Sequence, residues 1–236
     1  MRRFCSQTPI TGHEVLLAGT EAHHLLHVNR VQVGESVILF DGTSGEYVAK
    51  LVEASKTSAR LEIVQRLGHN RMPTTDLTLL TAVAKGSRMD VLVQMTCELG
   101  VSTLVPVLTS RSVVNPGANK VEHWRRIVLE SCKQSGRNLL MTIENPIPVC
   151  DVVVQPRSDA LKLLLSTAQD VRPIVELLNP RPDKVVLLVG PEGGFTEEES
   201  RAAEGAGFLP VSLGQSTLRI ETAGVCASAI VLTTLG

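Results

Sequence analysis

The chain has 236 residues, enough for one large domain or two small ones, and its formal net charge at pH 7 is only −1. Hydrophobic residues make up 43% and charged residues 20%, which excludes a disordered or fibrous protein. Aromatic residues make up 3%, so few rings are available to stack on nucleic-acid bases. No apolar run reaches the length of a membrane span, and the N-terminus lacks the apolar core of a signal peptide.

The cysteines are scattered, odd in number and form no CxxC pair; they are Cys5, Cys97, Cys132, Cys150 and Cys226. This distribution argues against a disulfide framework and against a zinc knuckle. It favours a reducing compartment, so we expect a cytoplasmic protein.

Positive charge is concentrated in one stretch. Residues 111–137 carry 6 Lys and Arg against 2 acids, whereas residues 138–236 carry 7 against 12. A local basic face of this kind can meet phosphates even in a chain that is not basic overall. A solvated helix face explains the charges equally well.

The first elements predict a small β domain over residues 1–70. TEAHHLLHVNRV has the pattern of a short helix, with Thr20 as its N-cap. Residues 30–66 alternate in the manner of antiparallel strands, and the pairs DG and SG mark a hairpin between them. The stretch GHNRMPTTD (residues 68–76) is rich in turn-forming residues and predicts a domain boundary.

The remainder, residues 73–236, predicts a second domain in which strands alternate with helices. The expected strands are DLTLLTAVA, TLVPVLT, ALKLLLSTA, KVVLLVG and LPVSLG. Between and after them come four expected helices, SRMDVLVQMTCELG, KVEHWRRIVLESCKQSG, TEEESRAAEGAG and IETAGVCASAIVLTTL. Continuous apolar strands separated by helices indicate an α/β fold with a mostly parallel sheet covered on both faces.

The stretch LLVGPEGGFTEEE (residues 187–199) predicts a buried strand, a glycine loop and a helix. It is not a phosphate-binding P-loop, because Phe195 and Thr196 follow Gly194 where a lysine is required. Thr196 and Glu199 form a capping box, and the acids of the first turn would repel a phosphate. The loop therefore favours a neutral or cationic ligand, although a tight turn without a ligand fits the same residues.

The stretch SLGQSTLRIETAG (residues 212–224) places a second loop before a helix rich in small residues. Arg219 and Glu221 stand two residues apart where that helix begins, either facing a polar substrate or pairing with each other. Ligands bind beyond the carboxyl ends of parallel strands, so both glycine loops are expected to line one crevice.

Three histidines, His23, His24 and His27, suggest a metal site because His23 and His27 share a helix face. HHLLH lacks the glutamate of the HExxH motif, and no third ligand is apparent, so we expect no metal.

Taken together and in this order, the stretches KGSRMDVLVQMTCELGVSTLVPVLTSRS, QSGRN, LLVGPEGGFTEEE and LGQSTLRIETA resemble the ribosomal RNA small-subunit methyltransferase E family. That SPOUT-class family methylates N3 of a uridine in 16S ribosomal RNA. HHLLHVNRVQVGESVILFDGTSGEYVA is similar to its N-terminal PUA-like β-barrel, which binds RNA. The resemblance implies S-adenosyl-L-methionine as cofactor, a trefoil knot in the C-terminal α/β domain, the small ribosomal subunit as partner, and a homodimer with sites at its interface.

The resemblance also assigns roles to residues of this chain. Arg219 and Glu221 would face the reacting centre, Arg219 to stabilise negative charge on the base and Glu221 to orient that arginine. The cofactor residues would be Leu165, Ser166, Gly190, Glu192, Gly194, Leu213, Gly214, Leu218, Thr222 and Ala223. The RNA side would be lined by Arg3, Arg30, Lys85, Arg88, Arg111, Gln134 and Arg137.

The chain departs from the family pattern at Asn29, Met141 and Thr217, where the family usually has leucine, proline and isoleucine. None of the three lies within the glycines of the two loops. Two other functions remain open: a SPOUT methyltransferase that acts on another RNA such as tRNA, and a non-catalytic RNA-binding or ribosome-assembly protein.

Overall fold

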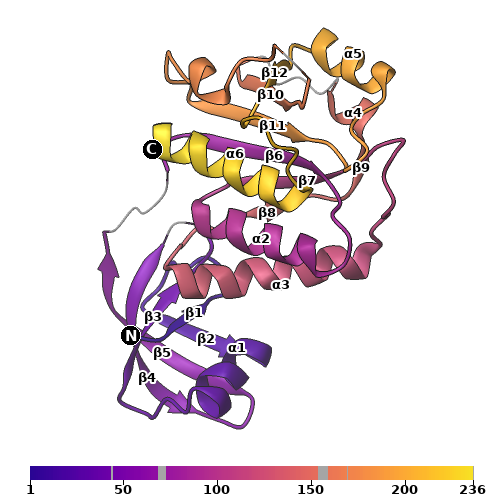
Figure 1. Ribbon diagram of the computed structural model, residues 1–236. Coiled ribbons are helices and arrows are strands. Elements are labelled where there is room, and N and C mark those ends of the chain that lie inside the picture. The colour runs from indigo at the N-terminus through magenta and orange to yellow at the C-terminus, as the bar shows by residue number, and fades with distance from the viewer. Residues whose placement is uncertain (44, 69–72, 154–158, 169, 236) are drawn as a thin grey trace. The chain divides into compact units, whose positions relative to one another are not determined.

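The computed structural model describes all residues except 44, 69–72, 154–158, 169 and 236 (Figure 1). Its contacts divide the chain into two compact units. The N-terminal unit comprises residues 1–72 together with Leu129–Leu140, and the C-terminal unit comprises Pro73–Val128 and Met141–Gly236. The boundary predicted at residues 68–76 falls partly on residues 69–72, which lie outside the described part of the chain.

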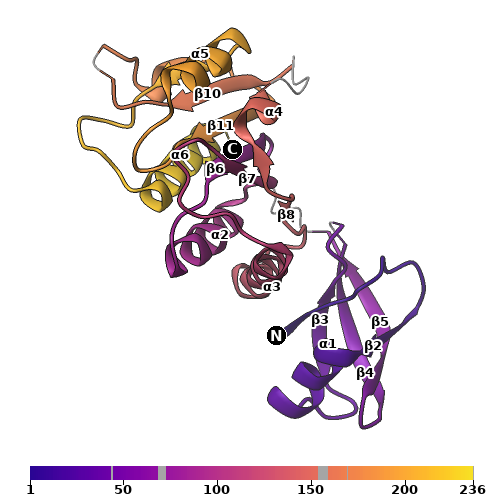
Figure 2. The ribbon, with the colours of Figure 1, turned by 90° about the vertical axis from the view of Figure 1, so that its right-hand side faces the viewer.

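The N-terminal unit is built on a five-stranded sheet with the order β1-β3-β4-β5-β2, and the sheet is curled (Figure 2). The strands are β1 (Arg3–Cys5), β2 (Glu14–Ala18), β3 (Ser36–Phe40), β4 (Glu46–Ala54) and β5 (Ser58–Leu67). β3, β4 and β5 pair antiparallel, as the alternation over residues 30–66 predicts, whereas β1 joins β3 in parallel. The inner face of the sheet buries an apolar cluster that includes Phe4, Leu39 and Leu61.

The helix expected near residue 20 is present, as α1 (Gly19–His23) followed by a π-helical turn η1 (His24–Val28). The prediction that Thr20 caps it is wrong. β2 runs to Ala18 and the helix begins at the next residue, so Ala18 occupies the N-cap position and no side chain caps the helix. Asn29 ends the π-helical turn, and its side chain donates to the carbonyl oxygen of His24 at 3.0 Å.

The hairpin between β3 and β4 is organised by Asp41. Its carboxylate accepts backbone N–H groups from Thr43, Gly45 and Ile10. Burial acts to raise the pKa of Asp41, but these hydrogen bonds outweigh burial and hold the pKa below its usual value. The DG pair therefore marks the turn as predicted, while Ser44 of the SG pair lies outside the described residues.

The C-terminal unit contains a second sheet with the order β12-β10-β11-β6-β7-β8, and β9 pairs with β7. Its strands are β6 (Asp76–Ala82), β7 (Thr103–Leu108), β8 (Thr142–Ile143), β9 (Ile147–Pro148), β10 (Leu161–Leu165), β11 (Lys184–Val189) and β12 (Leu209–Val211). All of these pairings are parallel, which confirms the predicted sheet. Short strands β8 and β9 were not anticipated from the sequence.

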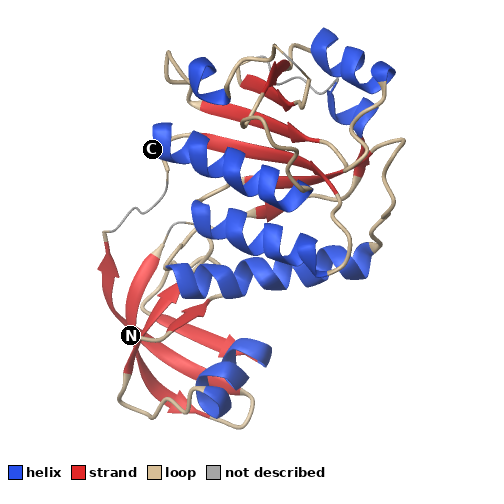
Figure 3. Ribbon diagram, in the orientation of Figure 1, coloured by secondary structure: helices blue, strands red, loops and turns tan. Residues whose placement is uncertain are grey.

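Helices cover both faces of the sheet (Figure 3). They are α2 (Ser87–Leu99), α3 (Ala118–Ser135), α4 (Val149–Val153), α5 (Glu197–Gly205) and α6 (Ile220–Leu235), with a short 3₁₀ turn η2 (Ile174–Leu177). Successive strand residues face opposite sides, so Leu80 packs in the cluster with Ala203 of α5 while Leu79 lies beside Gly224 of α6. This two-sided burial explains the continuous apolar strands.

The small residues of α6 allow it to pack closely against α2. A Cβ on Gly224 would lie 2.8 Å from Leu92 Cδ1 of α2, closer than a methyl group tolerates. The predicted tight packing of this helix is therefore present. In the part of the chain that the structure describes, no helix is long and apolar enough to cross a membrane.

Candidate functional site

A cavity of about 390 Å³ lies where three neighbouring strands of the C-terminal unit end. β12, β10 and β11 are adjacent in the sheet and parallel, so their carboxyl ends meet at one edge. The loops that follow them contribute Ser166, Gly190 and Gly214 to the lining. The expectation that both glycine loops line one crevice is confirmed, and a third loop, after β10, joins them.

The lining is dominated by small and apolar residues. The groups that line it are Leu164, Leu165, Ser166, Thr167, Ala168, Val189, Gly190, Pro191, Glu192, Gly194, Phe195, Ser200, Leu213, Gly214, Ser216, Thr217, Leu218, Ile220 and Ala223. Its volume is in the range of small-molecule pockets, which are mostly apolar with a few placed polar groups. Glu192 is the only charged side chain among these lining residues.

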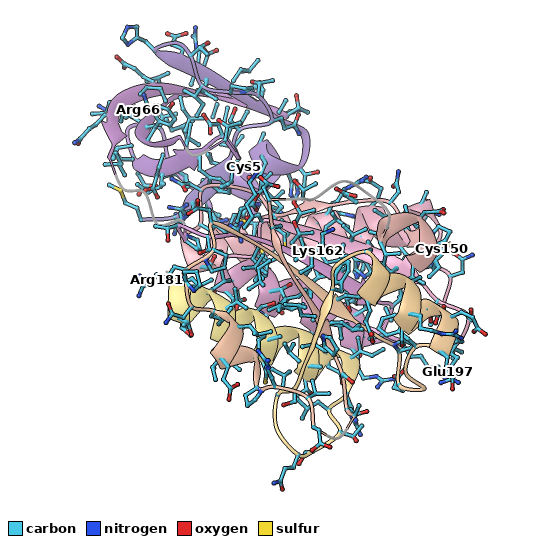
Figure 4. All side chains as sticks on the ribbon, turned by 90° about the horizontal axis from the view of Figure 1, so that it is seen from above. Cys5, Arg66, Cys150, Lys162, Arg181 and Glu197 are labelled. Atoms are coloured by element: carbon cyan, nitrogen blue, oxygen red, sulfur yellow. The ribbon has the colours of Figure 1, made fainter. Side chains whose placement is uncertain are left out.

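The first loop, residues 190–195, is tightly folded. The Gly194 N–H donates to the Pro191 carbonyl oxygen at 2.8 Å, which closes a turn. A Cβ on Gly190 would lie 2.7 Å from the Phe195 ring, so the ring packs directly on bare backbone. The capping box is present, since Thr196 and Glu199 exchange hydrogen bonds at 3.2 and 2.9 Å. The helix end is thus already satisfied, while Glu197 points outward where α5 begins (Figure 4).

Residues that follow β7 hold this loop from outside. Arg111 Nη1 donates to the carbonyl oxygen of Gly193, and the Ser110 N–H donates to the Glu199 carboxylate at 2.7 Å. A second contact joins Arg111 Nη1 to the Phe195 carbonyl oxygen at 3.4 Å. Arg111, which the sequence suggested for the RNA side, thus contacts the first loop through two carbonyl oxygens.

The second loop brings Arg219 and Glu221 to the start of α6. They do not form the ion pair that their spacing permits, because Glu221 instead faces Arg88 of α2, with 3.9 Å between Oε2 and Nη1. The same nitrogen lies 3.3 Å from Glu192 Oε1 of the first loop. Arg219 is exposed and makes no ion pair with any described residue.

Two family models match this chain. An RNA methyltransferase domain matches residues 70–232, and an RNA methyltransferase PUA domain matches residues 17–64. The chain belongs to the RNA methyltransferase family. The first match covers the unit that holds the cavity, and the second falls in the curled sheet of the N-terminal unit.

Relatives of this RNA methyltransferase carry a more specific name. A protein from Aquifex aeolicus named ribosomal RNA small subunit methyltransferase E is 35% identical over 225 residues, covering 94% of this chain and 95% of the relative. One of the same name from Synechocystis is 34% identical, covering 91% and 71%.

Solved structures agree in fold. The ribosomal RNA small subunit methyltransferase E of Neisseria gonorrhoeae, bound to S-adenosyl methionine, has a TM-score of 0.91 at 33% identity and covers 100% of this chain and 98% of that one. A methyltransferase of Legionella pneumophila in complex with the same cofactor has a TM-score of 0.90 at 32% identity, covering 98% and 97%.

Most of the residues that the sequence suggested for the cofactor lie together at the cavity of this RNA methyltransferase. Nine of the ten line the cavity, and the exception, Thr222, is exposed on α6. The lining also includes polar and small residues that the sequence did not single out, among them Thr167, Ala168 and Ser216, each within two residues of a predicted cofactor residue. Their positions in the loops that follow β10 and β12 would have been enough to predict them from the sequence.

The residues predicted for the RNA side do not form one group. Arg30, Lys85 and Gln134 are exposed. Arg137 is 5% exposed, and the Arg3 side chain is 12% exposed and forms an ion pair with Glu46. Arg3 also donates to the Arg137 carbonyl oxygen and lies over the Phe40 ring.

The cations of the basic stretch 111–137, which runs through both units, are largely engaged in intramolecular contacts. Lys120 contacts Asp90, Arg125 contacts Glu122 and the Ile143 carbonyl oxygen, and Lys133 contacts Glu21 and Glu130. The sequence left open whether these charges form a phosphate-binding face or a solvated helix face. In the structure, most of these cations instead have intramolecular partners.

A metal site at the histidines finds no strong support in the described residues. Glu21, His24 and Glu130 bring ligand atoms within 4.8 Å of one another, but Lys133 Nζ bonds to both carboxylates. Burial together with the charge of Glu21 raises the pKa of the nearby Cys5 thiol to about 12, which favours the protonated thiol over the nucleophilic thiolate.

Two of the residues that depart from the family pattern, Met141 and Thr217, have defined surroundings in the structure. Met141 is 3% exposed, and its sulfur lies 3.9 Å from Thr96 Oγ1 of α2, so it fills the core below that helix. Thr217 lines the cavity.

Proposed function

We propose that this chain binds S-adenosylmethionine in the cavity of its C-terminal unit and transfers the methyl group to N3 of a uridine in 16S ribosomal RNA of the small subunit. The observation that carries the proposal is the cavity itself, whose lining includes nine residues named for the cofactor from the sequence. Its support is the function named for the Aquifex aeolicus relative and the cofactor named for the Neisseria gonorrhoeae structure.

The residues present fit this cofactor. An adenosine offers hydroxyls and ring nitrogens, which the backbone of the loops at Gly190, Leu213 and Gly214 can bind. The sulfonium is cationic, so the Glu192 carboxylate at the cavity wall is compatible with it. Glu199, already bonded to Thr196 and Ser110, occupies the helix end that a phosphate would need.

When bound, the cofactor supplies an electrophilic methyl group on a positively charged sulfur. The chain contributes alignment of the two reactants and stabilisation of charge on the base. Uridine N3 bears a proton and loses it in the reaction, which leaves negative charge on the neighbouring base oxygens. Arg219, exposed at the loop that lines the cavity and not paired with a described acid, is the group we assign to that charge.

RNA recognition is assigned mainly to the N-terminal unit, which matches the PUA domain of RNA methyltransferases. With 3% aromatic residues, the chain is expected to rely on phosphate contacts and RNA shape more than on base stacking. Arg30 and Gln134 in that unit, and Lys85 in the C-terminal unit, are exposed and remain proposed RNA contacts.

We also infer a homodimer with the sites at its interface, a trefoil knot around the cofactor loops, and a cytoplasmic location. The dimer is supported by apolar side chains left exposed on α2: Val91 and Met95, one turn apart, are 45% and 43% exposed. A single-protomer mass in sedimentation equilibrium would count against the dimer.

The cytoplasmic location is supported by five free cysteines.

The decisive experiment is methylation of purified small subunits that lack the modification. The subunits are incubated with S-adenosylmethionine, with and without the protein, and the modified nucleotide is mapped by mass spectrometry. A 3-methyluridine that depends on the protein supports the proposal. Methylation of tRNA but not of the subunit would show that the substrate is tRNA and not 16S ribosomal RNA. Absence of cofactor binding in calorimetry would favour the non-catalytic assembly protein.

A further inference from the structure

Arg88 lies at the start of α2 with an acid of each cofactor loop beside it. Its Nη1 is 3.3 Å from Glu192 Oε1, on the loop after β11, and 3.9 Å from Glu221 Oε2, at the start of α6. All three residues belong to the C-terminal unit. One guanidinium nitrogen therefore connects three segments that are far apart in the sequence.

The two acids depend on this cation. Glu221 Oε2 is buried and has no hydrogen-bond partner among the described residues, and the Glu221 side chain is 14% exposed. Arg88 is the only cation within ion-pair distance of either acid in the described chain. Without it, two carboxylates would face the same space, one of them poorly hydrated, and their repulsion would act to separate the loops.

We propose that Arg88 is a positioning residue that clamps the two cofactor loops together by neutralising Glu192 and Glu221. The inference rests on the proposed cofactor site and deepens it. It gives Arg88 a different task from the RNA contact that the sequence suggested. It also gives Glu221 a different partner, because Arg88 and not Arg219 is the arginine beside its carboxylate.

The surroundings of Arg88 favour the clamp over an RNA contact. Its side chain is 31% exposed, and two carboxylates within 4 Å already compensate its charge. A phosphate approaching Arg88 would also approach Glu192, which is 44% exposed. Lys85, three residues earlier, is exposed and has no described acid within ion-pair distance, so it provides the contrasting case.

The first test is a calorimetric titration with S-adenosylhomocysteine in the absence of RNA. This probe lacks the sulfonium charge, so a change in the charge of the site does not mask a change in loop geometry. Arg88→Ala is expected to weaken binding about tenfold. A loss of this size lies within the range of interaction energies between residues in contact. Arg88→Lys restores the charge without the forked geometry and should lose about threefold. Arg201→Ala, which removes an exposed cation of α5 whose partner Glu197 lies outside the cavity lining, serves as the control and should bind as the wild type does.

The second test asks whether the loss arises from the stranded carboxylates. In a double-mutant cycle, Arg88→Ala is combined with Glu221→Gln, which removes one of the two charges. The clamp predicts that the double variant binds S-adenosylhomocysteine more tightly than Arg88→Ala alone. If the affinity losses of the two single variants simply multiply in the double variant, the proposal is overturned. If Arg88 acted only in folding, Glu221→Gln would not restore the affinity that Arg88→Ala loses.

The third test separates the clamp from an RNA contact. Binding of 16S ribosomal RNA is measured at several salt concentrations, where loss of one phosphate contact lowers the slope by about 0.7–0.9. Arg88→Ala should leave the slope unchanged. A reduced slope with unchanged S-adenosylhomocysteine affinity would assign Arg88 to RNA and refute the clamp. If the wild-type protein binds no S-adenosylhomocysteine, it is the proposed function that fails.

Discussion

At the scale of single residues, the arginines near the cavity have distinct environments. Arg88 faces two carboxylates, Arg111 donates to loop carbonyl oxygens, and Arg219 is exposed and makes no ion pair with a described residue. A guanidinium whose hydrogen bonds are already used holds structure, whereas one that is unpaired at a cavity is available to a substrate. Only Arg219 of these three fits the role of charge stabilisation.

Replacement of Arg219 should therefore separate binding from catalysis. Arg219→Ala is expected to lower the methyl-transfer rate by about 10²–10³-fold, because it removes one stabilising donor from the transition state. Affinity for S-adenosylhomocysteine should stay within about twofold in the same measurement. Arg201→Ala, on the exposed surface of α5, is the control. Equal losses of rate and affinity would show that Arg219 supports the loop instead.

At the scale of elements, Asp90 joins α2 to the first half of α3. Its carboxylate accepts from the Trp124 indole N–H at 3.0 Å and contacts Lys120 and His123 at 3.2 and 3.1 Å. Burial acts to raise the pKa of Asp90, but the hydrogen bonds from His123, Lys120 and Trp124 and the charge of Lys120 outweigh it. The pKa therefore lies below its usual value.

The stability of the C-terminal unit should depend on this carboxylate. Asp90→Ala strands the N–H of fully buried Trp124 and should lower the free energy of unfolding by about 2 kcal/mol. Asp90→Asn keeps an acceptor and should cost less. Because a lowered pKa stabilises the folded protein above the unfolded pKa of about 3.9, the gap between wild type and Asp90→Asn should shrink as pH falls below about 4. Urea unfolding at several pH values measures both effects, and a constant gap would contradict them.

At the scale of the whole molecule, the cations of residues 1–72 differ in how they are paired from those of the basic stretch 111–137, which runs through both units. In the N-terminal unit, Arg2, Arg30, Lys50, Lys56 and Arg66 are exposed and make no ion pair with described residues (Figure 4 labels Arg66). The basic stretch 111–137 looks more strongly charged in the sequence, but its cations are mostly paired. Free positive charge for phosphates is thus expected on the N-terminal unit.

This distribution predicts which substitutions change RNA binding. Arg30→Gln should lower the salt slope of RNA affinity by about 0.7–0.9, since it removes one free cation. Arg60→Gln is the matched control, because Arg60 is also exposed but pairs with Glu53 and Glu14. Fluorescence anisotropy over a range of salt concentrations gives both slopes. Equal slopes for wild type and Arg30→Gln would remove Arg30 from the RNA surface.

The sequence by itself determined the longer strands and helices and the place of the site. Apolar runs between helices specify a parallel sheet, and the carboxyl ends of such strands must meet at one edge, so the loops at Gly190 and Gly214 were predictable neighbours. Local signals such as the capping box of Thr196 and Glu199 were equally readable, because their partners lie within one helical turn.

Only the tertiary structure decided the partners of charged side chains. Arg88 with Glu192 and Glu221, Arg111 with Gly193, and the placement of Leu129–Leu140 in the N-terminal unit all join segments distant in the sequence. A long side chain reaches whatever acid or carbonyl oxygen the packed backbone brings near it, and no periodicity records that choice. The same formal charge can therefore bind a substrate, hold a loop or pair with a neighbouring acid, and only folding distinguishes these roles.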